Sequence, residues 1–287
     1  MDPVPVLEIG GTHVTAALVH DASAEIAARL PLPPNGSKAE ILDGIATAAA
    51  RLDAPAGSQW GVAVPGPFDY DAGIGLFRDV GKFESLYGVD VKAELTSRLP
   101  EPAELRFLND ADAFGIGEHV AGAAAGHRRA VCLTLGSGVG SAFLDDGVPV
   151  NDGPLVPPEG SAYRVRYQGR PLEETVSRRA IRAAYGQDAP DVQAIAELAR
   201  GGDRHAQTVL ANAFHALGLA IGPWLAKFSA TVLVVGGSIA ASWDLVEGPL
   251  KAGLRSTAEL RTARRAQDAP LLGAAWWATR PRSGSGR

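Results

Sequence analysis

Two segments of the chain share one pattern, and this pattern limits the folds that the chain can adopt. "LEIGGTHVTAALV" begins at Leu7 and "LTLGSGVGSAFLD" begins at Leu133. Each contains an apolar run, a glycine-rich bend with a hydroxyl residue and a second apolar run, which is typical of a hairpin between buried strands. The repetition indicates an internal duplication, with the same hairpin opening each half of the chain.

The rest of the chain alternates between strand and helix patterns, which predicts a mixed α/β fold with two lobes. In the first half, strands are expected at 6–9, 14–19, 25–30, 60–64 and 105–108, and helices at 38–52 and 91–99. In the second half, strands are expected within 130–150 and at 230–235, and helices at 172–185, 192–200, 203–228, 245–254 and 271–278.

The composition indicates a soluble globular protein with a small-molecule partner. The 287 residues can bury a substantial core, 21% of them are charged, and the formal net charge is −5. Such a chain offers no basic surface for a nucleic-acid backbone or an anionic membrane. It shows neither a secretory leader pattern nor an uninterrupted apolar stretch of membrane-spanning length, so we expect a cytoplasmic protein.

Cysteine and histidine usage argues against disulfides and against metal clusters. The single cysteine, Cys132, cannot form an intramolecular disulfide, and its place in "AVCLTL" predicts a buried core thiol. The six histidines show no metal-ligand spacing and are interpreted as surface or packing residues. The tail 280–287 consists of Gly, Ser, Arg and Pro and is predicted to be disordered.

The glycine bends either bind phosphate or only turn the chain. Glycine permits positive φ and close approach to a ligand, and successive backbone N–H groups can bind an anion. "GSGVGS" is not a dinucleotide fingerprint because strand residues follow it, and no GxxxxGK[ST] occurs. Either bend alone is equally well explained as a structural turn, whereas two bends in duplicated lobes favour a polyphosphate held from two sides.

A second candidate for chemistry is "LNDADAFGIGE", which begins at Leu108. Asp110 follows a predicted strand and begins a predicted helix, so it is either an N-cap or a carboxylate at the strand edge where ligands gather. In the second case, it can accept a proton from a substrate hydroxyl as a positioned base.

At this point the sequence resembles a known family. "EIGGT", "GVAVPGP", "LNDADAFGIGE", "LTLGSGVGSAFL", "LEETVS", "VLVVGGSIA" and "LLGAAW" occur in the order and approximate spacing of the ROK (repressor, open reading frame, kinase) sugar kinases, which are similar to bacterial glucokinases. The resemblance implies a two-lobe ribonuclease-H-like, actin-like fold with duplicated βββαβαβα lobes, an interlobe cleft and a homodimer. It implies a small lobe of 1–118 joined by a helix at 270–279, and a large lobe of 119–269.

The resemblance also implies roles for individual residues in ATP-dependent transfer of the γ-phosphoryl group to a hexose hydroxyl with Mg²⁺. Asp110 matches the catalytic base, Asn109 a sugar-hydroxyl contact and Gly66 the loop beside the sugar. Glu159 and Glu173 match two acidic sugar ligands. The positions that match the phosphate loops and the adenosine turn are Gly10, Gly11, Thr12, Gly136, Ser137, Gly138, Gly140, Gly236 and Gly237.

The sequence departs from the family at several positions. Glu8 replaces the usual aspartate of the first loop, where a carboxylate would contact Mg²⁺ through water, and Ser238 replaces a third glycine. Ala162 stands where a zinc-ligating histidine is expected, and no cysteine follows, so no structural zinc is expected. "YRVRYQG" in the same loop is either an exposed strand or a segment in which Arg164 or Arg166 contacts the acceptor.

The leading hypothesis is therefore an ATP-dependent kinase acting on a primary hydroxyl of glucose, an amino sugar or a C7-cyclitol. A polyphosphate donor is a variant of this hypothesis. A catalytically inactive sugar-binding protein is the alternative, and Asp110 argues against it. A sugar-sensing repressor is disfavoured, because repressors of the family carry a winged helix-turn-helix ahead of the kinase-like part, whereas the first phosphate loop of this sequence begins at Glu8.

Overall fold

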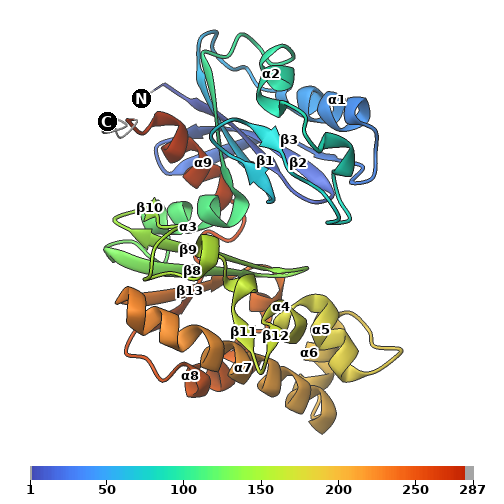
Figure 1. Ribbon diagram of the computed structural model, residues 1–287, viewed down its shortest axis with the longest axis vertical. Helices are drawn as coiled ribbons and strands as arrows, with labels where there is room; N and C mark the ends of the chain where they lie inside the picture. Colours follow the sequence, from blue (N-terminus) through green and yellow to red (C-terminus); the bar gives the residue numbers. More distant parts are fainter. Residues whose placement is uncertain (1, 282–287) are drawn as a thin grey trace. The chain divides into compact units, whose positions relative to one another are not determined.

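The computed structural model describes residues 2–281, in which the chain forms two compact units (Figure 1). Unit 1 contains the described residues up to Val120 and from Gln267 onward, and unit 2 contains Ala121–Ala266. Most of the tail predicted to be disordered, 282–287, lies outside the described residues.

Unit 1 is built on a five-stranded sheet with the order β3-β2-β1-β4-β7. The strands are β1 (Val4–Ile9), β2 (His13–His20), β3 (Ser23–Pro31), β4 (Gln59–Val64) and β7 (Glu104–Asn109). β1, β2 and β3 pair antiparallel, whereas β1, β4 and β7 run parallel. Parallel strands place their carboxyl ends at one edge, so β1, β4 and β7 end on the same side of the unit.

Helices cover both faces of this sheet. α1 (Lys38–Ala49) begins with a capping box of Ser37 and Glu40 and packs its apolar side on β2 and β3. α9 (Ala269–Thr279) crosses β1 and β4, where a Cβ on Gly61 would lie 2.2 Å from the carbonyl oxygen of Ala274. The remaining elements of the unit are β5 (Phe68–Asp69), β6 (Ile74–Gly75), a 3₁₀ turn η1 (Glu84–Leu86), α2 (Val91–Thr96) and α3 (Asp110–Ala121).

Unit 2 repeats the same sheet with the order β10-β9-β8-β13-β14. Its strands are β8 (Arg129–Leu135), β9 (Val139–Asp145), β10 (Val148–Pro149), β13 (Val232–Gly236) and β14 (Glu259–Thr262). The first three are antiparallel, and β8, β13 and β14 are parallel, as in unit 1. Cys132 is fully buried in β8, as expected of a core thiol. The equal strand order and direction confirm the duplicated α/β class.

The helices of unit 2 are α4 (Glu173–Val176), α5 (Arg178–Tyr185), α6 (Val192–Arg200), α7 (Arg204–Phe228) and α8 (Trp243–Leu254). α7 and α8 lie side by side (Figure 1), and Gly218 and Gly222 bring the α7 backbone against Leu254 of α8. The prediction of a single helical segment at 172–185 is wrong in one respect. Ser177 is extended and its side chain caps α5, so the segment forms two helices.

Several short elements complete unit 2. They are the 3₁₀ turns η2 (Pro158–Gly160), η3 (Ala162–Arg164) and η4 (Ser238–Ser242), and the hairpin of β11 (Arg166–Tyr167) and β12 (Arg170–Pro171). β14, an edge strand, was not predicted from the sequence, because "ELRT" is polar and lacks a strong apolar alternation.

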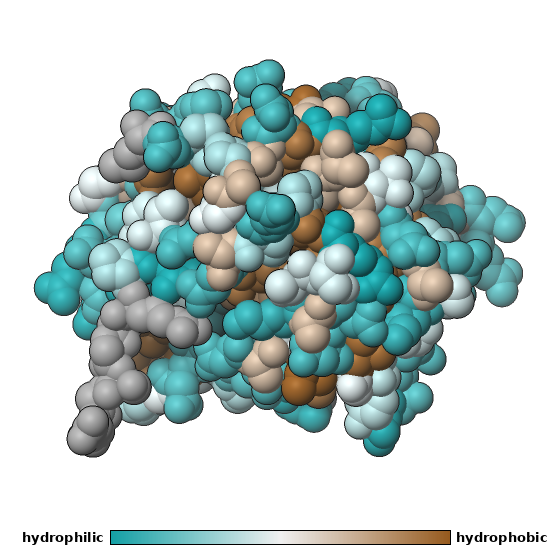
Figure 2. All heavy atoms as spheres, turned by 90° about the horizontal axis from the view of Figure 1, so that it is seen from above, coloured by the Kyte–Doolittle hydropathy of each residue, from teal (hydrophilic) through white to brown (hydrophobic). Residues whose placement is uncertain are grey.

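α7 is the one helix among residues 2–281 that is long and apolar enough to span a membrane by length and composition. Of its apolar window, 61% is buried inside the protein, so core packing accounts for its composition. Figure 2 shows a face on which hydrophilic residues predominate and apolar residues form small patches between them.

Candidate functional site

In unit 1, the candidate site begins where β7 ends and α3 starts. The Asn109 carboxamide oxygen accepts hydrogen bonds from the backbone N–H groups of Ala111 (2.9 Å) and Asp112 (3.3 Å). The Asp110 carboxylate also accepts from the N–H of Ala111, at 2.9 Å. Asn109 therefore supplies most of the helix cap. The N-cap role that the sequence suggested for Asp110 belongs mainly to Asn109.

The loop after β4 approaches the same residues. Gly66 precedes Pro67 through a cis peptide bond, and a Cβ on Gly66 would lie 3.4 Å from the hydroxyl oxygen of Tyr70. The Asn109 side-chain amide donates to that hydroxyl at 3.0 Å. The structure thus brings Gly66 and Asn109 together through Tyr70, which the sequence analysis did not single out. The only signal was a hydroxyl-bearing aromatic three residues after "PGP".

The first glycine bend connects β1 to β2 at the same edge of the sheet. The N–H of Gly10 donates to the carbonyl of His13 at 2.8 Å, which closes the bend. Around Gly11, a Cβ would meet nothing within 4 Å, and the Thr12 side chain is exposed. The bend is therefore a tight turn whose outer side is open to a ligand.

Two carboxylates interact at this edge. Burial raises the pKa of Asp110, while the charge of Lys82 opposes this rise. Burial also raises the pKa of Glu8, and the Asp110 charge raises it further, against a hydrogen bond from Thr15. A part-buried pair of acids that repel each other fits a cation, because a cation relieves both the burial and the repulsion.

The residues present fit Mg²⁺ rather than a metal enclosed by protein ligands. Among residues 2–281, no three His, Cys, Asp or Glu side chains gather into a metal-binding group. Mg²⁺ keeps several waters and is often held by one or two carboxylates together with substrate phosphates. Glu8, a carboxylate beside the charge of Asp110, matches that donor set.

Glu8→Gln is expected to raise the free energy of unfolding at pH 7 when divalent cations are removed with EDTA. A carboxyl whose pKa is raised on folding contributes stability below the pKa of the unfolded chain and loses it as the pH rises through the folded-state pKa. The gain of the variant should therefore vanish at pH values below about 4, under the ordinary glutamate pKa. Urea unfolding from pH 3 to pH 8 measures it, and a variant less stable than wild type at pH 7 would contradict the assignment.

In unit 2, the second glycine bend connects β8 to β9. The N–H of Gly136 donates to the carbonyl of Gly138 at 3.1 Å, and Ser137 at the tip is exposed. The Glu173 carboxylate accepts from the N–H of Val139 at 3.3 Å, and one of its oxygens lies 2.8 Å from where a Cβ on Gly138 would stand. Glu173, predicted as a sugar ligand, therefore borders the predicted phosphate loop.

The turn after β13 lies against that bend. Gly237 has φ of 87°, and a Cβ there would lie 2.4 Å from the carbonyl oxygen of Leu135. The next residue, Ser238, has its hydroxyl oxygen 3.5 Å from the Cβ position of Gly136. The structure thus brings together the two predicted parts of the nucleotide site in unit 2, the bend at 136–140 and the turn at 236–237.

The loop that replaces the zinc motif is anchored by a buried hydroxyl. Ser141 of β9 donates to the carbonyl of Gly160 and accepts from the N–H of Ala162, both at 2.7 Å. The exposed-strand interpretation of "YRVRYQG" is wrong for Arg164, which lies in η3, and holds only for the short hairpin of β11 and β12. Arg164 pairs with Glu159 at 2.7 Å, so this predicted sugar ligand already has a cationic neighbour.

Ser141→Ala is expected to destabilise the protein by about 2 to 4 kcal/mol, because it leaves two buried backbone groups without partners. Ser161→Ala, in the same loop, removes only an exposed bond to the Glu159 carbonyl and should cost less than about 1 kcal/mol. Urea unfolding measures both. Equal effects of the two substitutions would show that Ser141 is not the anchor.

Comparison with known proteins gives consistent matches over nearly the whole chain. The sequence model of the ROK family matches residues 5–281. A glucokinase of Thermotoga maritima is 27% identical over 94% of this chain and 95% of its own length. An N-acetylmannosamine kinase of Haemophilus influenzae is 26% identical over 94% of this chain and 93% of its own length.

Among solved structures, a ROK family glucokinase from Streptomyces griseus, in complex with glucose and AMPPNP, superposes with a TM-score of 0.77. The match covers 96% of this chain and 99% of the glucokinase chain, at 22% sequence identity. This last likeness confirms the predicted fold, that of actin-like ATPases and sugar kinases.

Proposed function

Because the chain belongs to the ROK family, we propose that it transfers the γ-phosphoryl group of ATP to a primary hydroxyl of a hexose or a hexose-like acceptor. The observation that carries this proposal is the position of Asp110, a part-buried carboxylate at the carboxyl edge of a parallel sheet. It is oriented by its own helix start and lies beside a side-chain amide, that of Asn109.

Asp110 would accept the proton of the attacking hydroxyl, and Asn109 and Gly66 would position the sugar. Burial supports the first role, because a raised pKa makes Asp110 a stronger base than an ordinary aspartate. In unit 2, the bend at 136–140 and the turn at 236–237 would bind phosphates and adenosine, and Glu159 and Glu173 would accept hydrogen bonds from sugar hydroxyls. The first bend at 10–12 would face the phosphates in unit 1.

Mg²⁺, when bound, would neutralise charge on the transferring phosphoryl group. Glu8 would hold it, directly or through water, and the electrostatic coupling of Glu8 to Asp110 supports this assignment. The chain's own residues would then supply positioning, which together with electrostatic stabilisation is the main protein contribution to phosphoryl transfer, and Asp110 would remove the proton.

The acceptor is proposed as glucose, an amino sugar or a C7-cyclitol. Relatives named glucokinase and N-acetylmannosamine kinase support the first two. The rim, where Ala162 stands in place of the expected histidine and Arg164 pairs with Glu159, leaves room for an amino sugar or a cyclitol as well as glucose. A catalytically inactive sugar-binding protein is the alternative function.

An ADP-release assay with ATP and Mg²⁺ tests the proposal across glucose, mannose, N-acetylated and amino hexoses, fructose and C7-cyclitols. One acceptor with kcat/KM well above the others is expected. In a parallel series, inorganic polyphosphate replaces ATP and the phosphorylated acceptor is measured directly, because this donor releases no ADP. ATP binding without acceptor-dependent ADP release from any member would favour the inactive sugar-binding protein.

A further inference from the structure

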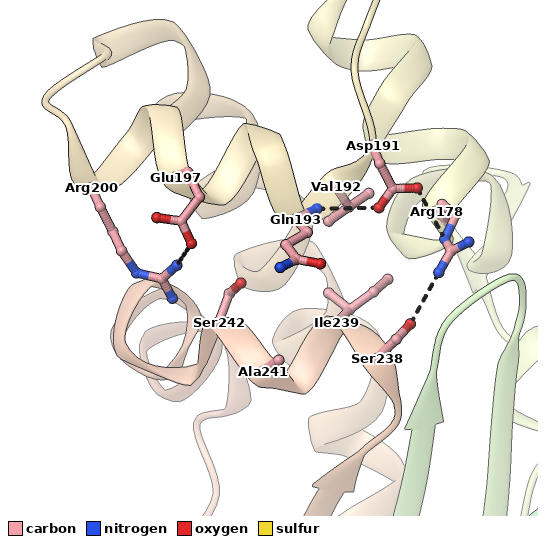
Figure 3. Close-up of a pocket in the computed structure, with 10 residues that line it drawn as sticks. All are labelled: Arg178, Asp191, Val192, Gln193, Glu197, Arg200, Ser238, Ile239, Ala241 and Ser242. Atoms are coloured by element: carbon pink, nitrogen blue, oxygen red, sulfur yellow. Dashed lines mark hydrogen bonds and ion pairs between the residues drawn. The ribbon is translucent and has the colours of Figure 1, made fainter.

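A cavity of about 180 Å³ lies in unit 2, between the helix pair α5 and α6 and the turn η4 (Figure 3). Ser238, directly after the turn at 236–237, lines one side of it, and Arg178 and Asp191 line the other. The cavity is thus continuous with the turn that would approach adenosine. No role in the proposed reaction has so far been assigned to Arg178.

Arg178 connects the two parts of the proposed nucleotide site. Its backbone N–H donates to the carbonyl of Gly136 in the glycine bend, at 2.9 Å. Its guanidinium Nη2 donates to the Ser238 hydroxyl at 3.4 Å, across 60 residues of sequence. The residue is therefore tied to the bend by its backbone and to the turn by its side chain.

The Arg178 guanidinium has more donors than partners. Its Nε is buried without a hydrogen-bond partner and forms a long ion pair with a carboxylate oxygen of Asp191, at 3.7 Å. Within the described residues, the long contact to Ser238 is the only hydrogen bond that uses one of the five N–H donors of this guanidinium. A buried polar atom without a hydrogen-bond partner calls for an explanation, and an anionic ligand at this position would supply one.

The second arginine of the cavity is different. Arg200 donates to Glu197 at 2.7 Å and to Asp244 at 2.7 Å and 2.9 Å, so its guanidinium is engaged within the protein. Figure 3 shows Arg200 turned toward Glu197, and Arg178 lying between Asp191 and Ser238. The unused donors of Arg178 therefore do not reflect a general excess of arginine in this cavity.

We propose that Arg178 binds a phosphate group of the nucleotide, at the point where the glycine bend and the turn at 236–238 meet. A planar guanidinium forms short, charge-assisted bonds to phosphate oxygens, and the Gly136 backbone and the Ser238 hydroxyl border the same place. This inference rests on the proposed function, because it assigns a residue to the nucleotide site of that kinase.

The test measures binding of ADP, AMP and adenosine to the full chain by isothermal titration calorimetry, without acceptor. Arg178→Gln is expected to weaken ADP binding about 10- to 100-fold and to leave adenosine binding within about twofold of wild type. Arg178→Lys keeps a point charge but loses the planar fork, so its affinity for ADP should lie between the two. Arg179→Gln is the matched control, because Arg179 is the next residue of α5 and is exposed.

Three results would overturn the inference. Unchanged ADP affinity in Arg178→Gln would show that the guanidinium does not bind phosphate. Equal weakening of ADP and adenosine, in a variant whose unfolding matches wild type, would show that Arg178 only shapes the turn. If wild type binds none of the three probes, the proposed kinase function fails together with the inference, whereas the first two results leave that function standing.

Discussion

Asp110→Asn is expected to lower the rate of acceptor phosphorylation by about 10²- to 10⁴-fold, the usual contribution of a positioned general base. The asparagine keeps the size of the side chain and can still accept from the Ala111 N–H, so the start of α3 should be preserved. Binding of ADP should remain near that of wild type, because the change removes a base rather than a nucleotide contact. Single-turnover kinetics with the acceptor found in the panel measures the loss.

Measuring the stability of Asp110→Asn shows whether a loss of activity comes from the missing base or from an unfolded protein. Burial raises the Asp110 pKa, so its ionised form opposes folding at pH 7, and Asp110→Asn should unfold at the same or higher urea concentration than wild type. Asp90→Asn is the matched control, because Asp90 caps α2 in the same unit and asparagine caps equally well. Near-normal turnover in Asp110→Asn would remove Asp110 as the base.

Gly237→Ala is expected to destabilise unit 2 by about 2 to 5 kcal/mol and to weaken nucleotide binding. Two costs add here. A side chain at φ of 87° is strained by about 1 to 2 kcal/mol, and the added Cβ would lie 2.4 Å from the Leu135 carbonyl oxygen, an overpacking typically worth about 1 to 3 kcal/mol. Leu135 directly precedes the glycine bend, so relieving the collision moves the bend. Urea unfolding and ADP calorimetry measure the two effects.

Gly126→Ala is the control that separates the cost of backbone strain in Gly237→Ala from the cost of the collision with Leu135. Gly126 has φ of 81°, close to that of Gly237, but a Cβ there would meet nothing within 4 Å. Its replacement should therefore cost only the strain, about 1 to 2 kcal/mol, and leave ADP binding unchanged. If both variants lose the same stability, the contact with Leu135 has no energetic role.

Features that depend on local pattern could be predicted from the sequence. The paired hairpins at Leu7 and Leu133 were recognisable because apolar runs on either side of glycine bends predict buried strands without any knowledge of their neighbours. The junction at Asp110 was recognisable for the same reason, because a polar pair ends an apolar run. The duplicated α/β fold followed from these elements and is confirmed, whereas the roles of the site residues remain predictions.

Contacts between residues far apart in the sequence were decided only by the tertiary structure. Ser141 anchors the loop at Gly160 across 19 residues, Tyr70 reaches Asn109 across 39, and Arg178 reaches Ser238 across 60. None of these side chains belongs to a local pattern, because a hydrogen bond depends on where the chain returns in space. The sequence alone therefore determined the class of fold and the candidate base, while folding decided which polar groups surround the base, anchor the rim and complete the cavity at Arg178.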